Sequence, residues 1–155
     1  MIQRKQTLYL LFSGLLMLLM PFVTIVKVSI PDMIYRLNAT GFEDLSGEVT
    51  MPSWGLFGLT ILIILLSFIS IFLYNRRVLQ MRITVFNLIL KIGFYALAYV
   101  YIRSFNQTVL ESGGVTALNI TVWAAAPLIA VIFDYLAHRG IAIDEKTIKY
   151  MDRLR

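Results

Sequence analysis

The sequence predicts an all-α membrane protein: a bundle of four transmembrane helices with a small β-hairpin or sheet in its first outer loop. Apolar residues make up 59% of the 155 residues, a composition typical of membrane proteins. They fall in four blocks, 8–26, 55–74, 83–102 and 117–137, each close to the roughly 20 residues that a helix needs to cross a bilayer. Trp and Tyr residues mark the ends of the blocks, as is usual at membrane interfaces. We therefore expect residues 1–155 to form a single integral membrane domain.

The charged residues orient the four blocks. If the blocks cross a membrane in alternation, three basic residues, Lys27, Arg36 and Arg103, fall on one side. Ten fall on the other side: Arg4, Lys5, Arg76, Arg77, Arg82, Arg139, Lys146, Lys149, Arg153 and Arg155. The positive-inside rule then predicts that both termini are cytoplasmic. Orientation and contact with anionic lipid account for the net charge of +5 without any nucleic-acid partner.

The first block follows Arg4 and Lys5, as the apolar core of a secretory signal peptide would. No small-x-small cleavage site comes after it, because the next residues run from Pro21 to Thr24 as Pro-Phe-Val-Thr. We therefore expect the block to be retained as the first span.

The first outer loop, residues 27–53, is too long for a simple turn between antiparallel helices. Residues 26–30 alternate between apolar and polar, Pro31 and Asp32 are typical of a turn, and residues 35–39 alternate again. Residues 48–51 are a candidate third strand. The loop is predicted to form a β-hairpin or three-stranded sheet on the outer surface, with an irregular polar loop as the alternative.

Two further segments lie outside the blocks. The second outer loop, residues 103–115, is predicted to be a plain connection. The tail, residues 139–155, is predicted to form an amphipathic helix on the inner leaflet, with a solvated tail as the alternative. Its apolar positions are Ile141, Ile148, Met151 and Leu154.

Two charged residues interrupt the apolar blocks. Lys91 lies inside the third block on a stripe with Thr84, Asn87 and Tyr95, spaced three or four residues apart, so this stripe should face protein. An unpaired ammonium at that depth costs about 2.5 kcal/mol or more. Asp134 lies near the inner end of the fourth block, which runs in the opposite direction to the third. A Lys91–Asp134 pair between neighbouring spans is therefore geometrically possible.

The candidate pair has two interpretations. It is either a structural clamp between helices, or part of a proton or ion relay or an anion-binding site, as in membrane carriers. A transport path normally needs polar groups through the whole membrane depth. Since the first two blocks offer little beyond Ser13, Ser67 and Ser70, the clamp is favoured.

Residue usage argues against an enzyme. The chain has no cysteine and one histidine, His138, so it has no thiol nucleophile, and one subunit has no multi-histidine metal cluster. The acidic doublets Glu43-Asp44 and Asp144-Glu145 have no histidine or second carboxylate at useful spacing. We expect no catalytic residues, no metal site and no cofactor.

Short segments at both ends of the chain carry a resemblance. They are Met1-Ile2-Gln3-Arg4, Gln6-Thr7-Leu8-Tyr9-Leu10, Asp144-Glu145 and Asp152-Arg153-Leu154-Arg155. The chain resembles an uncharacterised family of small four-span inner-membrane proteins of the Bacteroidota, a domain of unknown function (DUF4293). The likeness covers the whole chain and implies a location, the bacterial inner membrane, and a four-helix architecture. It implies no activity.

In outline, the claudin-like arrangement is also similar, with four helices that support an extracellular sheet made mainly by the first outer loop. The cysteine pair of that family is missing here.

Three functional hypotheses follow from the sequence. The leading one is a non-enzymatic membrane scaffold or accessory subunit, with the lipid bilayer, other membrane proteins or a second copy of the chain as candidate partners. The second is a small carrier or proton-coupled permease that uses Lys91, Asn87 and Asp134. The third, an enzyme acting on lipid, is disfavoured because no nucleophile and base lie in reach.

Overall fold

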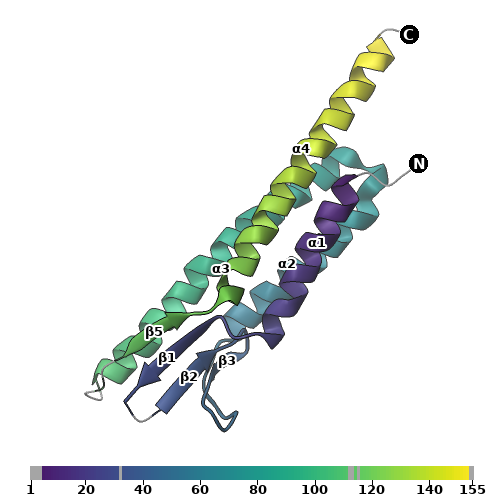
Figure 1. The fold of residues 1–155 in the computed structure, drawn as a ribbon. Helices are drawn as coiled ribbons and strands as arrows, with labels where there is room; N and C mark the ends of the chain where they lie inside the picture. Colours follow the sequence, from purple (N-terminus) through teal and green to yellow (C-terminus); the bar gives the residue numbers. More distant parts are fainter. Residues whose placement is uncertain (1–4, 32, 112–113, 115, 154–155) are drawn as a thin grey trace.

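Four helices form an elongated bundle with a β-sheet at one end (Figure 1). The computed structural model describes residues 5–31, 33–111, 114 and 116–153. Helix α1 starts and helix α4 ends at the end of the bundle away from the sheet (Figure 1). The helices are α1 (Lys5–Leu19), α2 (Trp54–Phe72), α3 (Arg77–Glu111) and α4 (Ala126–Arg153), with short 3-10 helices η1 (Met20–Phe22), η2 (Leu73–Asn75) and η3 (Val122–Ala125).

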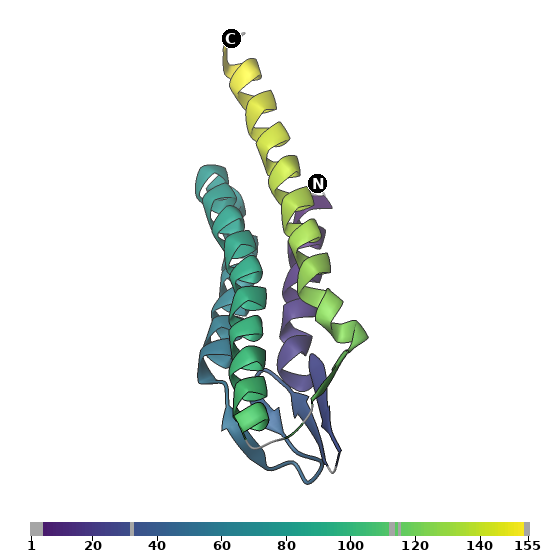
Figure 2. The same cartoon turned by 90° about the vertical axis from the view of Figure 1, so that its left-hand side faces the viewer.

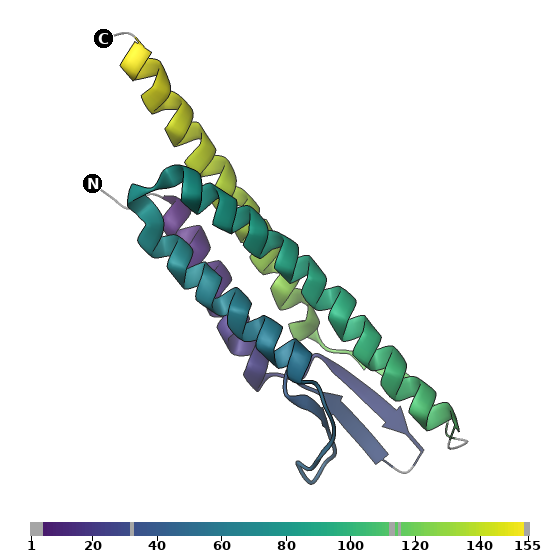
Figure 3. The same ribbon diagram turned by 180° about the vertical axis from the view of Figure 1, so that it is seen from behind.

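The helices pack in a ring. Both α1 and α3 pack against α2 and α4, and the views from the side and from behind show the same order (Figures 2 and 3). Two glycines allow α1 to approach its neighbours closely: a Cβ on Gly14 would lie 3.3 Å from Ser67 Cβ on α2, and one on Gly140 would lie 2.7 Å from Gln6 Cγ on α1. A larger residue at Gly14 would crowd Ser67, and one at Gly140 would displace the Gln6 side chain.

Three helical stretches are long and apolar enough to cross a membrane: Trp54–Asn75, Arg77–Glu111 and Val122–Thr147. The first helix, Gln6–Phe22, is apolar but shorter. Large apolar side chains on all four helices face outward, among them Leu8, Phe12, Leu65, Phe72, Phe86, Ile89, Ile132 and Tyr135. Soluble monomers rarely expose apolar surface on this scale.

The sheet has five antiparallel strands in the order β4-β3-β2-β1-β5. They are β1 (Val26–Ile30), β2 (Met33–Leu37), β3 (Gly41–Glu43), β4 (Val49–Pro52) and β5 (Ala117–Ile120). The prediction of paired strands in the first outer loop is confirmed, and this loop supplies four strands instead of two or three. Alternation has the expected effect in β1, where Val26 and Val28 are buried and Lys27 is exposed. Asp32, part of the predicted turn, lies outside the described residues.

The second outer loop is not the plain connection predicted. Helix α3 continues through residues 103–111 instead of ending near residue 102, and residues 117–120 form strand β5 beside β1 instead of starting the fourth span. The extension of α3 is stabilised by the sheet, because Phe105 and Val109, one helical turn apart, are buried against it. The apolar run after residue 116 suits a helix or a strand equally, and pairing with β1 decides between them.

The first and last helices also differ from their predicted limits. The helical part of the first block ends at Phe22, after Pro21 within η1, and Val26 already belongs to β1. Helix α4 runs without a break through the predicted tail to Arg153 and extends beyond the bundle (Figure 2). The side chains of Ile148, Met151 and Leu154, on which the amphipathic prediction depended, lie outside the described part of the chain.

The sheet and the bundle share one core. Phe105 of α3 stacks on Phe42 of β3, with ring centroids 4.1 Å apart, and meets Tyr35 of β2 edge-on at 5.1 Å. These rings adjoin Val28 and Leu37 in the same buried cluster that continues between the helices to Phe94. The extension of α3 therefore joins the two parts of the molecule.

We expect Phe105→Ala to destabilise the protein by about 3–5 kcal/mol, the usual cost of removing a buried aromatic ring. The measurement is the melting temperature of purified protein in mild detergent. Phe86→Ala is the matched control, because Phe86 lies on the same helix with half of its surface exposed and should shift the melting temperature little. Equal shifts for the two variants would contradict the shared core.

Candidate functional site

An ion pair is buried at the centre of the helix bundle. Lys91 Nζ of α3 donates a hydrogen bond to Asp134 Oδ2 of α4 and forms a salt bridge with it. Ser13 Oγ of α1 accepts from Lys91 Nζ at 2.7 Å and donates to Asp134 Oδ1 at 2.6 Å. All three side chains have no exposed surface. Three helices thus meet in one closed triangle of hydrogen bonds.

Asn87 brings the fourth helix into this cluster. Its amide lies 2.7 Å from Ser67 Oγ of α2. When the amide is turned so that its oxygen faces donors, the oxygen also accepts from Lys91 Nζ at 3.2 Å and its nitrogen donates to the Ile63 carbonyl at 3.3 Å. An ammonium has three protons to donate, and Ser13, Asp134 and Asn87 then accept one each. With the amide in this orientation, the buried charge of Lys91 is fully hydrogen-bonded.

A second group of hydrogen bonds lies between this cluster and the turn that joins α2 to α3. Ser70 Oγ and Thr84 Oγ1 are 3.1 Å apart, Thr84 also donates to the Gln80 carbonyl at 2.9 Å, and Gln80 Nε2 donates to the Ser70 carbonyl at 2.9 Å. All three side chains are buried. Polar groups therefore follow the α2–α3 interface from Gln80 to Lys91. This part of α3 is roughly 16 Å long at a rise of ~1.5 Å per residue.

The half of the bundle nearer the sheet is different. Beside and beyond Lys91 the core contains fully buried apolar side chains: Met17, Met20, Leu56, Ile63, Phe94 and Ala130. Thr60 is also buried there, but its hydroxyl donates to the Leu56 carbonyl of its own helix at 2.7 Å. The polar series ends at the ion pair and does not cross the bundle.

Tyr95, the last residue of the predicted stripe, does not contact the ion pair. Its hydroxyl donates to the Ala124 carbonyl at 2.6 Å and accepts from the Leu128 amide at 3.0 Å. A helix leaves its first amide groups without partners inside the helix, and Tyr95 satisfies one of them at the start of α4. Its role is to hold that helix end against α3.

The structure brings together most of the residues singled out from the sequence. Lys91 contacts Asp134, Asn87 adjoins them, and Thr84 lies in the second group. Sequence reasoning treated Ser13, Ser67 and Ser70 as too few to matter, yet each supplies a hydrogen bond in this site. Gln80 was missed, although its position four residues before Thr84 continues the polar stripe.

The site has little chemistry beyond charge and hydrogen bonding. Each buried polar group in the triangle is bonded to another, so none faces an open cavity as a free base or nucleophile would. Among the described residues, no group of three or more His, Cys, Asp or Glu side chains could hold a metal ion.

Comparison with known proteins gives a family match. A family model described as Domain of unknown function (DUF4293) matches residues 2–154. No curated protein matches the sequence.

We expect Lys91→Met and Asp134→Asn each to lower the melting temperature in detergent, by an equivalent of about 3–5 kcal/mol, because each leaves an uncompensated buried group. The double variant should recover much of the loss, because two neutral side chains need no charged partner. Lys146→Met is the matched control, since Lys146 is an exposed lysine on α4 and its loss should have little effect.

If the losses of melting temperature in the two single variants simply add in the double variant, the clamp is contradicted. A relay has a different signature in vesicles with an imposed pH gradient: the wild type would take up protons, and the single and double variants would all be inactive, however stable. We expect no uptake above that of protein-free vesicles.

Proposed function

Because the chain belongs to the family described as Domain of unknown function (DUF4293), which names no activity, we propose its function from the geometry alone. The protein is a non-enzymatic membrane scaffold or accessory subunit, whose bundle holds the sheet at one face of the bilayer for partners to bind. One observation carries this proposal: the charged cluster at the centre of the bundle is closed and fully hydrogen-bonded.

The proposal requires the bundle to cross a membrane. Its apolar outer surface and three helices of spanning length support this. The stretch Gln6–Phe22 adds a fourth span of about 25 Å by ~1.5 Å per residue, slightly short of the ~30 Å hydrocarbon core. Local thinning of the bilayer accommodates a short span at modest cost.

We place the protein in the bacterial inner membrane with the sheet outside and both termini in the cytoplasm. Basic residues support this orientation, since Arg76, Arg77 and Arg82 lie at the α2–α3 turn and the end of α4 is also basic. The family resemblance of the chain ends supports the bacterial location.

A clamp suits a scaffold because it fixes helix positions. The buried charges at Lys91 and Asp134 are costly to desolvate, and the arrangement repays this cost only when every partner is in place. Other packings of the same apolar helices would leave these groups unsatisfied. The cluster therefore specifies one arrangement of the bundle, and this arrangement positions the sheet through α3.

The outer face of the sheet is the surface we assign to partners. Lys27 and Arg36 are exposed and lie directly opposite each other on β1 and β2. Like charges at such positions destabilise a strand pair. Glu43 of β3 lies opposite Arg36 on its other side and offsets part of this repulsion, whereas Lys27 has the neutral Asn119 on its other side. A partner with acidic groups would relieve the repulsion that remains.

A carrier is the second candidate, favoured by the polar series from Gln80 to Lys91. This series resembles half of a path for protons. Beyond Lys91, however, the buried residues Ile63 and Phe94 are apolar, and a carrier would need an opening there. The vesicle uptake assay on the ion-pair variants separates the two functions.

The absence of native cysteine allows a direct test of orientation. We expect Ser46→Cys, in an exposed turn beside the sheet, to react with an impermeant maleimide in intact spheroplasts. Thr147→Cys, exposed near the end of α4, should react only after the membrane is permeabilised, because the two positions lie at opposite ends of the bundle. Labelling of both, or of neither, before permeabilisation would sink the proposed topology.

The docking surface is tested with a photo-crosslinking amino acid at Ile34, a partly exposed residue on the same face of β2. In cells, we expect a discrete crosslinked product that becomes several-fold weaker in the double variant Lys27→Ser/Arg36→Ser, because charge guides association. Arg76→Ser, at the other end of the bundle, is the matched control and should leave the product unchanged. An unchanged product in the sheet variant would reject the basic face as the docking surface.

A further inference from the structure

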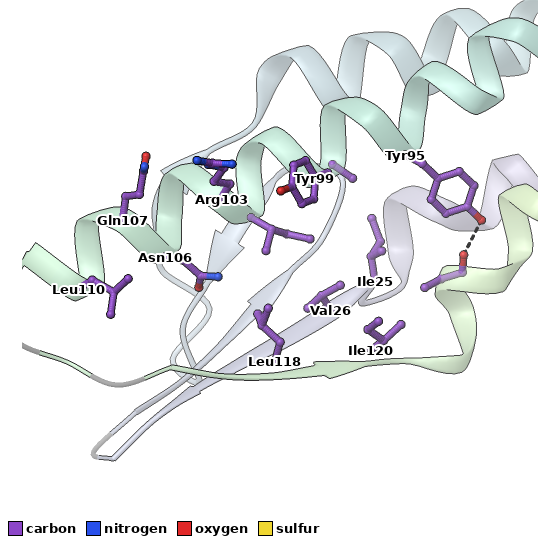
Figure 4. A pocket seen from close by; sticks show the side chains of 13 residues that line it. Ile25, Val26, Tyr95, Tyr99, Arg103, Asn106, Gln107, Leu110, Leu118 and Ile120 are labelled. Carbon is purple, nitrogen blue, oxygen red and sulfur yellow. Dashed lines mark hydrogen bonds between the residues drawn. The ribbon is translucent and has the colours of Figure 1, made fainter.

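A groove of about 670 Å³ runs between α3 and strand β5 (Figure 4). Ala98, Ile102 and Leu110 line it from α3, and Leu118 and Ile120 line it from β5, with Val26 of β1 at its floor. The groove exists because α3 packs over the middle of the sheet, where Phe105 meets Phe42, and leaves the edge strand β5 uncovered.

The apolar walls of this groove are unusually open. Ile120 is 77% exposed and Leu118 is 49% exposed, although they lie beside the buried Val26 and Val28 on the same face of the sheet. Tyr99 and Leu110 face the groove from α3 and are also more than half exposed. An apolar ligand would bury these side chains and gain stability from the area removed from water.

The groove lies at the level where the bundle meets the outer surface of the membrane. From Arg77 to Arg103, helix α3 rises about 39 Å at ~1.5 Å per residue, close to the thickness of a bilayer with its headgroup regions. Arg103 is therefore at headgroup depth. Ala98 and Tyr99, about one turn before it, are at the depth where acyl chains begin.

Polar groups gather at the headgroup end of the groove. Arg103 is the one charged residue in its lining, and no carboxylate within the described ranges forms an ion pair with it. Asn106 Oδ1, one turn further along α3, is a buried oxygen without a hydrogen-bond partner. Gln107 adds a second amide. This end offers a cation for an anionic group and an acceptor for a hydroxyl or ammonium donor.

We propose that the groove between α3 and β5 binds an anionic phospholipid from the leaflet on the side of the sheet. Its phosphate lies at Arg103, a headgroup hydroxyl donates to Asn106 Oδ1, and an acyl chain lies along Ala98, Ile102 and Ile120. This inference rests on the proposed membrane orientation. It deepens the scaffold function, because the lipid would fill the space between α3 and the edge of the sheet.

Charge and depth favour a lipid over a polypeptide here. A partner strand on the free edge of β5 would need only backbone groups, and it would leave Arg103 without an anion. A phospholipid has its phosphate at the depth of Arg103 and its apolar part at the depth of Ala98. One molecule therefore complements both the charged end and the apolar end of the groove.

Lipid binding is measured by native mass spectrometry of the full chain in mild detergent, titrated with dioleoyl phosphatidylglycerol or dioleoyl phosphatidylcholine. We expect tighter binding of phosphatidylglycerol, whose headgroup is anionic and has hydroxyl donors. Arg103→Gln should weaken phosphatidylglycerol binding by about fivefold, as expected for a partly exposed ion pair, and should weaken phosphatidylcholine binding less, because the choline ammonium already offsets the charge of its phosphate. Ile120→Asp should weaken the binding of both lipids, because it places a carboxylate in the apolar groove.

Arg36→Gln is the matched control, an exposed arginine on the outer face of the sheet, and should change neither affinity. Ile120 is mostly exposed, so Ile120→Asp should fold, with the melting temperature of the lipid-free protein as the check. If Ile120→Asp does not fold, Leu118→Asp serves as the second groove variant. Unchanged lipid binding in both Arg103→Gln and a folded groove variant would overturn the proposal, as would a polypeptide that occupies the groove and excludes both lipids. The binding assay is done in detergent and needs no bilayer. Loss of the proposed lipid site can therefore be distinguished from a wrong membrane orientation, which the cysteine-labelling experiment tests separately.

Discussion

The hydrogen-bonded triangle of Lys91, Asp134 and Ser13 is the constraint on which the rest of the structure depends. Two charges without exposed surface are tolerated only if each finds its full set of partners. Here the partners come from different helices, with Asn87 and Ser67 extending the contacts to α2. Apolar packing between membrane helices discriminates poorly among rotations and shifts, because lipid tails are as apolar as the helix surfaces. The triangle supplies the discrimination that apolar packing lacks.

Helix α3 transmits this constraint to the sheet. The same helix carries Lys91 at the centre of the bundle and Phe105 in the core of the sheet, so the position of one fixes the position of the other. Its extension over the sheet also creates the groove beside β5, because the helix covers only part of the sheet. The position of the sheet on the bundle and the open apolar groove therefore both follow from one long helix. This arrangement suits a platform better than a gate.

The polar residues of the bundle are distributed unevenly, and this bears on function. From Gln80 to Lys91 they recur at each turn of α3 in two hydrogen-bonded groups, and beyond Lys91 the core contains Ile63 and Phe94. A path for protons or ions needs acceptors along its whole length. Half a path is compatible with a structural role, in which polar contacts stabilise the turn between α2 and α3 and the ion pair fixes the middle of the bundle.

The sequence by itself determined the four apolar helices, the paired strands of the first outer loop, and the stripe that carries Thr84, Asn87 and Lys91. These features follow from local periodicity, which a chain displays without reference to its fold. Only the tertiary structure decided that residues 117–120 form an edge strand, that α3 continues to Glu111, and that isolated serines on α1 and α2 complete the charged cluster. The physical reason is the same in each case: strand pairing, burial of Phe105 and hydrogen bonds to Lys91 all join segments far apart in the sequence, and no local pattern records which distant residue will be the partner.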